Sequence, residues 1–590
     1  MTTIIKESTV VVASDEKVFE SLVDKFDNVP ASFTDDWSAF TKFLSKNRLK
    51  SKCKTDGLVW GLSDQDCADP HVRLLSQAWN KKSATPKEQA LLQMMQVLDL
   101  PVQQWTVVHA TLALGLTQKL VALSKTCSLN TWAGIFQKLF SVVQDIEIAA
   151  PDDVLALQLV AVELPLRLAV QLPSLRLFDE FTAVAFDRLF DEQREWLDSD
   201  GAIHASLVDR MIGFLACWTR CQMLADDLEI QPDEAAQLNW EWFLRYSMRM
   251  CRADGSMMLT SGQYAYSLEL FKSAIKTSTD KDDKLIARQL LPGANANKKR
   301  TESFTEQGVF SEWAGLGVLQ ADWDPDSPRI ALAVHEDVCD IEVCRAQSLV
   351  RIHRLPNVSI NGKLLGVEQD AEWEEVFSHF DDDLNYVELE LQLQDGVRLQ
   401  RQLIHPADDD LFLIADSVFA TVAERIDYRL DLTLPPSVTA MQETENSEIY
   451  LQRQRKNKLT IESVMLPVGV SEWKQRGQPN CFDVLPTGVA LQQSIVGSRL
   501  YAPLAIQLNS KKSLLPRTWR KLTVAEKLEL QTDDVAVAYR IRIGDDQLVI
   551  YKSFDEPGNR TFLGQNHSCD FFIGRLKPDG SVKELLSVEA

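Results

Sequence analysis

The hydrophobic pattern of this chain changes its period near residue 295. Before this point, apolar residues recur at positions i, i+3 and i+4, which places them on one face of a helix. After it, apolar and polar residues alternate, as in strands that bury one face of a sheet. A helical pattern does not suit a strand, and an alternating pattern does not suit a helix. The sequence therefore predicts an α+β multidomain protein, with an all-α half followed by an antiparallel all-β half.

The first half is predicted to contain amphipathic helices joined by short loops. Pro151-Asp152-Asp153 and Pro232-Asp233-Glu234 indicate helix starts, because proline lacks an N–H there and acidic side chains favour the positive end of the helix dipole. Short connections favour antiparallel helical hairpins. The predicted helices span residues 85–98, 101–125, 128–145, 152–172, 176–197, 204–228, 232–252 and 262–277.

The second half is predicted to be a set of strands, with hairpin turns at Asp395-Gly396 and Gly544-Asp545-Asp546. The polar segment 292–309, PGANANKKRTESFTEQGV, is interpreted as a linker between domains 1–291 and 310–590. The predicted strands span residues 387–393, 397–404, 411–416, 428–434, 448–454, 458–466, 504–509, 535–543 and 547–554.

Two Asp-Gly pairs follow helices in the first half, in LDSDGAIH (197–204) and CRADGSMML (251–259). Their spacing equals about two helices and two loops, a period that suits a ring of helical hairpins, an α/α toroid. In such a ring, both turns border one cleft. The alternative is that each Asp-Gly pair only ends a helix.

Composition restricts the partners of the chain. A net charge of −23 argues against nucleic acid, whose phosphates require a basic surface. The N-terminus lacks a secretory signal pattern, and no uninterrupted apolar stretch reaches about 18 residues. The ten cysteines contain no Cys-x-x-Cys pair. We therefore expect a cytoplasmic protein with free thiols and no membrane partner.

Three segments of the second half, together with the order of the two halves, resemble the heparinase II/III-like group of polysaccharide lyases. They are LQRQLIHPADDDLFLIADSV (399–418), WEEVFSHFDDDLNYVELEL (373–391) and NRTFLGQNHSCDFFIGRLKPDGSVKELLSVE (559–589). The resemblance implies an N-terminal α/α toroid and a C-terminal antiparallel β-sandwich. It also implies an acidic polysaccharide or oligosaccharide as substrate, cleaved beside its uronic acid by β-elimination, for which a base removes the C5 proton and an acid protonates the leaving oxygen.

The resemblance also suggests catalytic residues. Active members carry an Asn-His pair in the toroid before a catalytic tyrosine, and His204 occupies a comparable place. The tyrosines downstream are Tyr246, Tyr264 and Tyr266. Asp200, Asp254 and Trp240 are candidates for substrate binding, since the Asp-Gly turns border the expected cleft and tryptophan can stack on a sugar. The alternative for His204 is an ordinary polar residue in the first turn of a helix.

Two departures from the family pattern favour an alternative function. Ile203 stands where the family has asparagine, and no His-x-His-x-Asp stretch occurs early in the second half, where His335 and His353 are isolated. No compact set of metal ligands is evident, so we expect no metal and no cofactor. A catalytically inactive relative that binds glycans or proteins is the alternative. A glycosidase using Asp200 and Asp254 is a third hypothesis.

Overall fold

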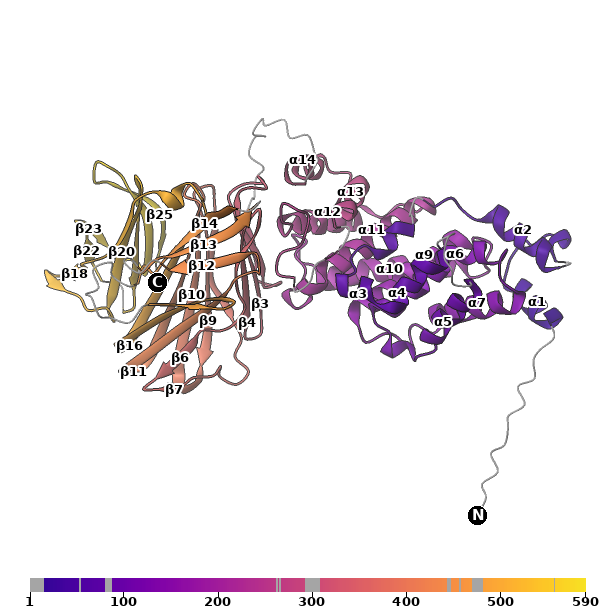
Figure 1. The fold of residues 1–590 in the computed structure, drawn as a ribbon, viewed down its shortest axis with the longest axis horizontal. Coiled ribbons are helices and arrows are strands. Elements are labelled where there is room, and N and C mark those ends of the chain that lie inside the picture. Colours follow the sequence, from indigo (N-terminus) through magenta and orange to yellow (C-terminus); the bar gives the residue numbers. More distant parts are fainter. Residues whose placement is uncertain are drawn as a thin grey trace, which may run out of the picture. The chain divides into compact units, whose positions relative to one another are not determined.

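In the structure, which is a computed structural model, the chain forms two compact units (Figure 1). The helical unit comprises Met1–Gly201, Asp209–Ser247 and Thr260–Lys284, and the strand unit comprises Ala202–Val208, Met248–Leu259 and Leu285–Ala590. Most of the predicted linker lies outside the described residues, which are 15–34, 36–51, 55–79, 87–260, 264, 267–291, 308–442, 447–455, 458–469, 481–555 and 558–589.

Each helix predicted between residues 85 and 277 has a counterpart in the structure, whereas the helices before residue 85 and after residue 280 were not predicted. The start predicted at Pro151-Asp152-Asp153 lies slightly later: Asp153 precedes the helix as its N-cap, and its carboxylate accepts the N–H of Ala156 at 2.9 Å. The helices are α1 (Asp15–Val23), α2 (Trp37–Asn47), α3 (Asp64–Ala68), α4 (Pro70–Trp79), α5 (Lys87–Val97), α6 (Val107–Leu123), α7 (Leu129–Gln144), α8 (Val154–Gln158), α9 (Leu164–Gln171), α10 (Phe178–Trp196), α11 (Met211–Asp227), α12 (Glu234–Arg249), α13 (Ser267–Thr277) and α14 (Lys281–Leu290).

The centre of the helical unit is one continuous helical stretch, Val154–Gln171, in which a π-helical turn joins α8 to α9. It is apolar and long enough to cross a membrane by composition, but 89% of it is buried inside the protein. A helix that is apolar all round suits such a core position. Within it, Glu163 is fully buried and accepts hydrogen bonds from Arg167 at 2.7 Å and Arg220 at 2.8 Å. The two guanidinium groups hold the pKa of Glu163 below its ordinary value against the opposing effect of burial.

One predicted helix begins later than expected. The sequence pattern placed its start at residue 204, but α11 begins at Met211, after a 3-10 turn over Ala205–Arg210. The helical period of this segment comes from the apolar residues Ile203, Ala205 and Val208. Their side chains are buried, but the segment belongs to the strand unit. The burial of this segment by tertiary contacts therefore overrode its local pattern.

The described residues of the strand unit form three antiparallel sheets, in which β11 and β16 make the longest pair (Figure 1). Asp395 and Gly396 both have positive φ in the tight turn between β9 and β10, as predicted for an Asp-Gly hairpin. The large sheet contains β1 (Val309–Ser311), β2 (Leu316–Gln320), β3 (Pro328–His335), β4 (Val338–Arg345), β5 (Gln347–Ile352), β6 (Asn357–Ile360), β7 (Lys363–Leu364), β8 (Glu374–Phe380), β9 (Leu384–Leu393), β10 (Val397–Pro406), β11 (Leu411–Thr433), β12 (Val438–Gln442), β13 (Ile449–Arg455), β14 (Lys458–Leu466), β15 (Phe482–Leu485) and β16 (Gly488–Gln507).

The two smaller sheets are built from the C-terminal part of the chain. The five-stranded sheet contains β17 (Arg517–Leu522), β20 (Ala536–Ile543), β21 (Asp546–Ser553), β24 (Phe571–Leu576) and β25 (Val582–Val588). The four-stranded sheet contains β18 (Ala525–Glu526), β19 (Glu529–Leu530), β22 (Arg560–Phe562) and β23 (Gln565–His567).

The sheets stack in layers, and β11 shows why. Phe412 and Ile414 lie in the core within the large sheet, while Leu411 and Leu413 lie in the core shared with the five-stranded sheet. Successive side chains of a strand point to opposite faces, so the continuous apolar run at the start of β11 is buried on both sides. A third core joins the five- and four-stranded sheets.

Candidate functional site

His204 lies in a short backbone segment that is pinned to the sheet of the strand unit. The N–H of Ala205 donates to the carbonyl oxygen of Ala314 at 2.7 Å. Ile203 is fully buried, and His204 itself is partly exposed. His204 Nδ1 lies 2.8 Å from Ser206 Oγ, within hydrogen-bonding distance. This contact orients the ring and leaves Nε2 for other partners.

The structure brings His204 next to two residues that are distant in the sequence. Its ring centroid lies 5.3 Å from that of His335, at the end of β3, with the rings at 80°. It lies 5.8 Å from the ring centroid of Trp313, also edge to face. The Trp313 side chain is 52% exposed. We call His204, His335 and Trp313 the histidine–tryptophan cluster.

The two imidazoles of this cluster influence each other electrostatically. Burial lowers the pKa of His204, and the positive charge that His335 acquires on protonation lowers it further. His204 is therefore neutral at neutral pH, the state in which an imidazole can accept a proton. His335 Nε2 lies 3.6 Å from the carboxylate of Glu336, which pairs with the ring when it is protonated.

Carboxylates lie around the cluster. Glu312 and Glu336 are exposed and are adjacent in sequence to Trp313 and His335. Burial raises the pKa of Glu375 on β8, and the negative charge of Glu312 adds to this effect.

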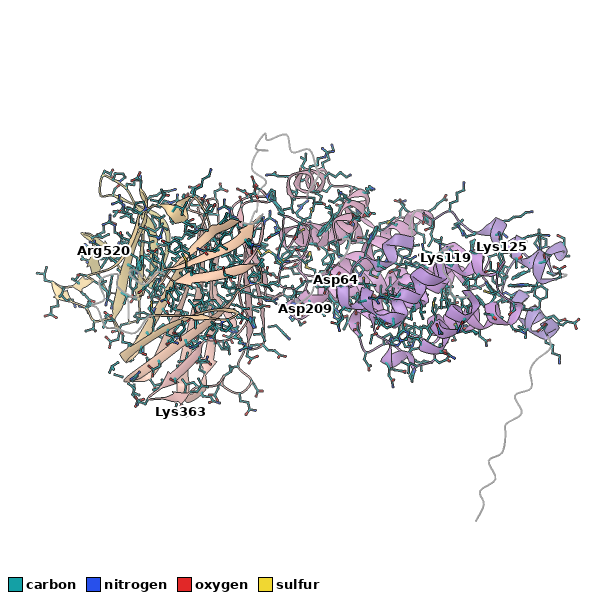
Figure 2. The ribbon with its side chains drawn as sticks, in the orientation of Figure 1. Asp64, Lys119, Lys125, Asp209, Lys363 and Arg520 are labelled. Carbon is teal, nitrogen blue, oxygen red and sulfur yellow. The ribbon has the colours of Figure 1, made fainter. Side chains whose placement is uncertain are left out.

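The helical unit contains a separate, small pocket beside Tyr264. The Tyr264 hydroxyl donates to the backbone oxygen of Asp209 at 3.0 Å. Burial raises the pKa of this phenol, and Asp209 raises it further. Arg210, which lies 3.4 Å from Asp153, also lines the pocket. Figure 2 labels Asp209, and the pocket is lined by Gly61, Asp66, Val107, Leu155, Asp209, Arg210, Gly213 and Tyr264.

Two of the predicted site residues are in the core of the helical unit. Tyr246 and Trp240 have no exposed surface, and the Trp240 indole N–H donates to Thr277 Oγ1 at 3.1 Å. Side chains in these positions have no surface with which to contact a polysaccharide. Tyr266, another predicted candidate, lies outside the described residues.

The first Asp-Gly turn is explained by packing. Gly201 has a φ of +78°, and a Cβ atom there would lie 2.3 Å from the backbone of Trp242 in α12. Only glycine permits this approach. Asp200, which precedes it, is exposed and belongs to the helical unit.

The second Asp-Gly turn belongs to the strand unit, as the tip of a short hairpin in which Cys251 pairs with Met257. The carboxylate of Asp254 accepts the N–H of Ser256 at 2.9 Å, so it closes its own turn. Arg252 donates to both carboxylate oxygens of Glu342 on β4, at 2.6 and 2.8 Å, and this pair fastens the hairpin to the sheet. The predicted pair Asp200 and Asp254 is thus divided between the two units.

Among the described residues, no group of three or more His, Cys, Asp or Glu side chains is arranged to hold a metal ion. The aspartate runs at 381–383 and 408–410 carry ion pairs. Arg575 on β24 lies 2.9 Å from Asp408 and 3.0 Å from Asp409. Lys583 on β25 lies 2.7 Å from Asp383. These turns therefore help to join the five-stranded sheet to the large sheet.

The fold is similar to those of solved polysaccharide lyases. A heparinase III gene product aligns with a TM-score of 0.57 and 10% identity, over 91% of this chain and 96% of its own. A second heparinase III structure gives 0.57 and 11%, over 93% and 92%. The heparan sulfate lyase HepC from Pedobacter heparinus gives 0.52 and 9%, over 92% and 93%. The sequence itself matches no protein-family profile and no curated protein.

These comparisons confirm the predicted architecture: the chain has a heparinase-like fold, an α/α toroid followed by an antiparallel β-sandwich. The sequence singles out His204 as a candidate but not its two neighbours. His335 is isolated in the sequence, because no second ligand stands near it in the chain. One feature of the sequence could have indicated Trp313. This large aromatic residue stands between Glu312 and Ala314, in a short segment of turn-forming residues that precedes an apolar strand.

Proposed function

We infer that this protein is a polysaccharide lyase that cleaves a uronic-acid glycan by β-elimination, with His204 and His335 as its proton-transferring pair. The observation that carries the proposal is the contact of the two imidazoles beside a half-exposed tryptophan. The heparinase-like fold supports it, since one protein of that fold is named as a heparan sulfate lyase.

The chemistry of β-elimination suits such a pair. The reaction requires a base for the C5 proton and an acid for the leaving oxygen, and neither step requires a covalent enzyme intermediate. His204 has a lowered pKa and accepts a proton near neutral pH. His335, whose Nε2 lies 3.6 Å from the Glu336 carboxylate, is the candidate donor. The exposed face of Trp313 offers a surface on which a sugar ring can pack.

The test is a panel of uronic-acid glycans incubated with the full-length protein, with the ultraviolet absorbance of the unsaturated product as readout. We expect His204→Ala and His335→Ala each to lower kcat by about 100-fold or more, the usual contribution of a general acid or base. His353→Ala is the matched control, because His353 is an exposed histidine of the same unit outside the cluster. Equal activity of all three variants would refute the assignment.

A glycan-binding protein without catalytic activity is the second candidate. Ile203 favours it, because the residue is buried and apolar where active relatives of the resembled family carry asparagine to engage the carboxylate. Glycan binding without any unsaturated product would support this second function. New reducing ends without unsaturation would instead support a hydrolase.

A further inference from the structure

Ser206 contacts one nitrogen of the His204 ring twice. Its hydroxyl oxygen lies 2.8 Å from Nδ1, and its backbone N–H donates to the same nitrogen at 3.4 Å. A backbone N–H can only donate a hydrogen bond, so Nδ1 must hold a lone pair. The proton of the neutral ring is then on Nε2. These contacts therefore identify Nδ1 as the basic atom of His204.

This tautomer also fixes the direction of the hydroxyl contact. Because Nδ1 carries no proton, the Ser206 hydroxyl donates across the 2.8 Å and Nδ1 accepts. The lone pairs of Ser206 Oγ stay available, and Ser206 is exposed. A hydroxyl that donates to an adjacent neutral imidazole is the activated form of a serine, because the ring can take its proton. The group that the basic side of His204 presents to a ligand is therefore the Ser206 hydroxyl.

The backbone around the two side chains holds them in place. The N–H of Ala205, which stands between them, donates to the carbonyl oxygen of Ala314 at 2.7 Å. The N–H of Leu207 donates to the carbonyl oxygen of His204 at 2.9 Å. Ala205 is buried, although Ser206 is exposed. The hydroxyl and the ring are thus pre-organised for proton transfer.

We propose that His204 acts as the base of the elimination through Ser206, whose Oγ contacts the C5 hydrogen of the uronate. Oγ takes the C5 proton while the hydroxyl proton passes to Nδ1 of His204, so Ser206 ends the step as a hydroxyl. The electron pair of the C5–H bond forms the C4–C5 double bond, and the C4–O bond breaks. His335 supplies the proton for the leaving oxygen. Each turnover therefore moves one proton from His335 to His204, and exchange with solvent returns it.

This inference rests on the proposed function for the reaction, but the tautomer can be measured without turnover. The measurement is nitrogen NMR of the full-length protein with labelled histidine, in which the signals lost in His204→Gln assign His204. We expect the proton of neutral His204 on Nε2. Ser206→Ala should keep this tautomer, because the backbone N–H that donates to Nδ1 remains.

The kinetic test uses the glycan of the lyase panel that yields the unsaturated product. Ser206→Ala should lower kcat by about 100-fold with little change in KM, because it removes the relay and leaves the ring in place. Ser206→Thr keeps a hydroxyl and should retain kcat within about tenfold of the wild-type value. Ser510→Ala, at an exposed serine of the strand unit, should change neither the tautomer nor kcat.

A proton on Nδ1 of neutral His204 would overturn the inference, as would wild-type kcat in Ser206→Ala. Equal losses of kcat in Ser206→Ala and Ser206→Thr would also overturn it, because the hydroxyl would then make no difference. A protein with the Nε2–H tautomer that cleaves no glycan of the panel would refute the proposed function and confirm the tautomer. A working lyase that is insensitive to Ser206→Ala would refute only this inference.

Discussion

The imidazoles of His204 and His335 lie 5.3 Å apart, one from a loop that precedes α11 and the other from the end of β3. Each ring therefore forms part of the electrostatic environment of the other. The consequence is a lowered pKa for His204, caused first by burial and then by its partner.

Replacing His335 by glutamine should raise the pKa of His204, because it removes the positive charge that opposes a second proton. If neutral His204 is the base, activity is lost as the pH falls through its pKa. The acid limb of the kcat/KM profile should then move to higher pH. The NMR titration of the His204 ring should move in the same direction. His353→Gln should move neither, and an unchanged titration in His335→Gln would contradict the coupling.

Tyr264 is the sequence-predicted tyrosine that keeps a hydroxyl beside the pocket of the helical unit. Because the proposed proton-transferring pair is His204 and His335, Tyr264→Phe should leave kcat within about twofold of the wild-type value. The lost hydrogen bond to Asp209 should cost only about 1 kcal/mol of stability. The control is Tyr539→Phe, a buried phenol in the strand unit. A kcat lowered by about 100-fold in Tyr264→Phe, with normal thermal stability, would contradict the histidine pair and favour the tyrosine.

Arg401 and Asp416 form an ion pair with no exposed surface between β10 and β11. Two hydrogen bonds of 2.8 and 2.7 Å join them, and the Tyr428 hydroxyl donates to the same carboxylate at 2.7 Å. Asp416→Leu should destabilise the strand unit by about 3–5 kcal/mol, because it leaves a buried guanidinium unpaired. Adding Arg401→Met should restore most of the loss in denaturant unfolding. A double variant no more stable than Asp416→Leu would show that packing, not charge, causes the loss.

Burial raises the pKa of Glu192 on α10 to about 7, although Arg188 lies 3.3 Å away and opposes the shift. Glu195, Glu147 and Asp191 add to the rise. In the unfolded chain the carboxyl loses its proton near pH 4.5, so the stability gained from its protonated form is complete below this pH. It is lost as the pH rises through about 7.

Glu192→Gln should remove this dependence. Relative to the variant, the wild-type protein should lose about 2 kcal/mol of stability between pH 5 and pH 8.5. The measurement is the melting temperature of both proteins across this range, with Glu529→Gln as the control. A constant difference between wild type and Glu192→Gln would contradict the raised pKa.

Much of the architecture could be predicted from local patterns. The Asp395-Gly396 turn was predictable because this pair accepts positive φ, and both residues adopt it. The helix start at Asp153 was predictable because its carboxylate can satisfy a free N–H. In both cases the decisive contacts lie within a few residues along the chain. The sequence pattern was wrong for the segment before α11, whose apolar residues are buried by tertiary contacts.

The kind and order of the elements follow from local sequence patterns, because the period of side-chain burial is a local property of helices and strands. Which polar residues meet depends on the tertiary structure. It placed His335 and Trp313 beside His204, and it buried Tyr246 and Trp240. The position of each of these residues depends on the pairing and packing of elements far apart in the chain. Such contacts cannot be predicted from a local pattern of residues.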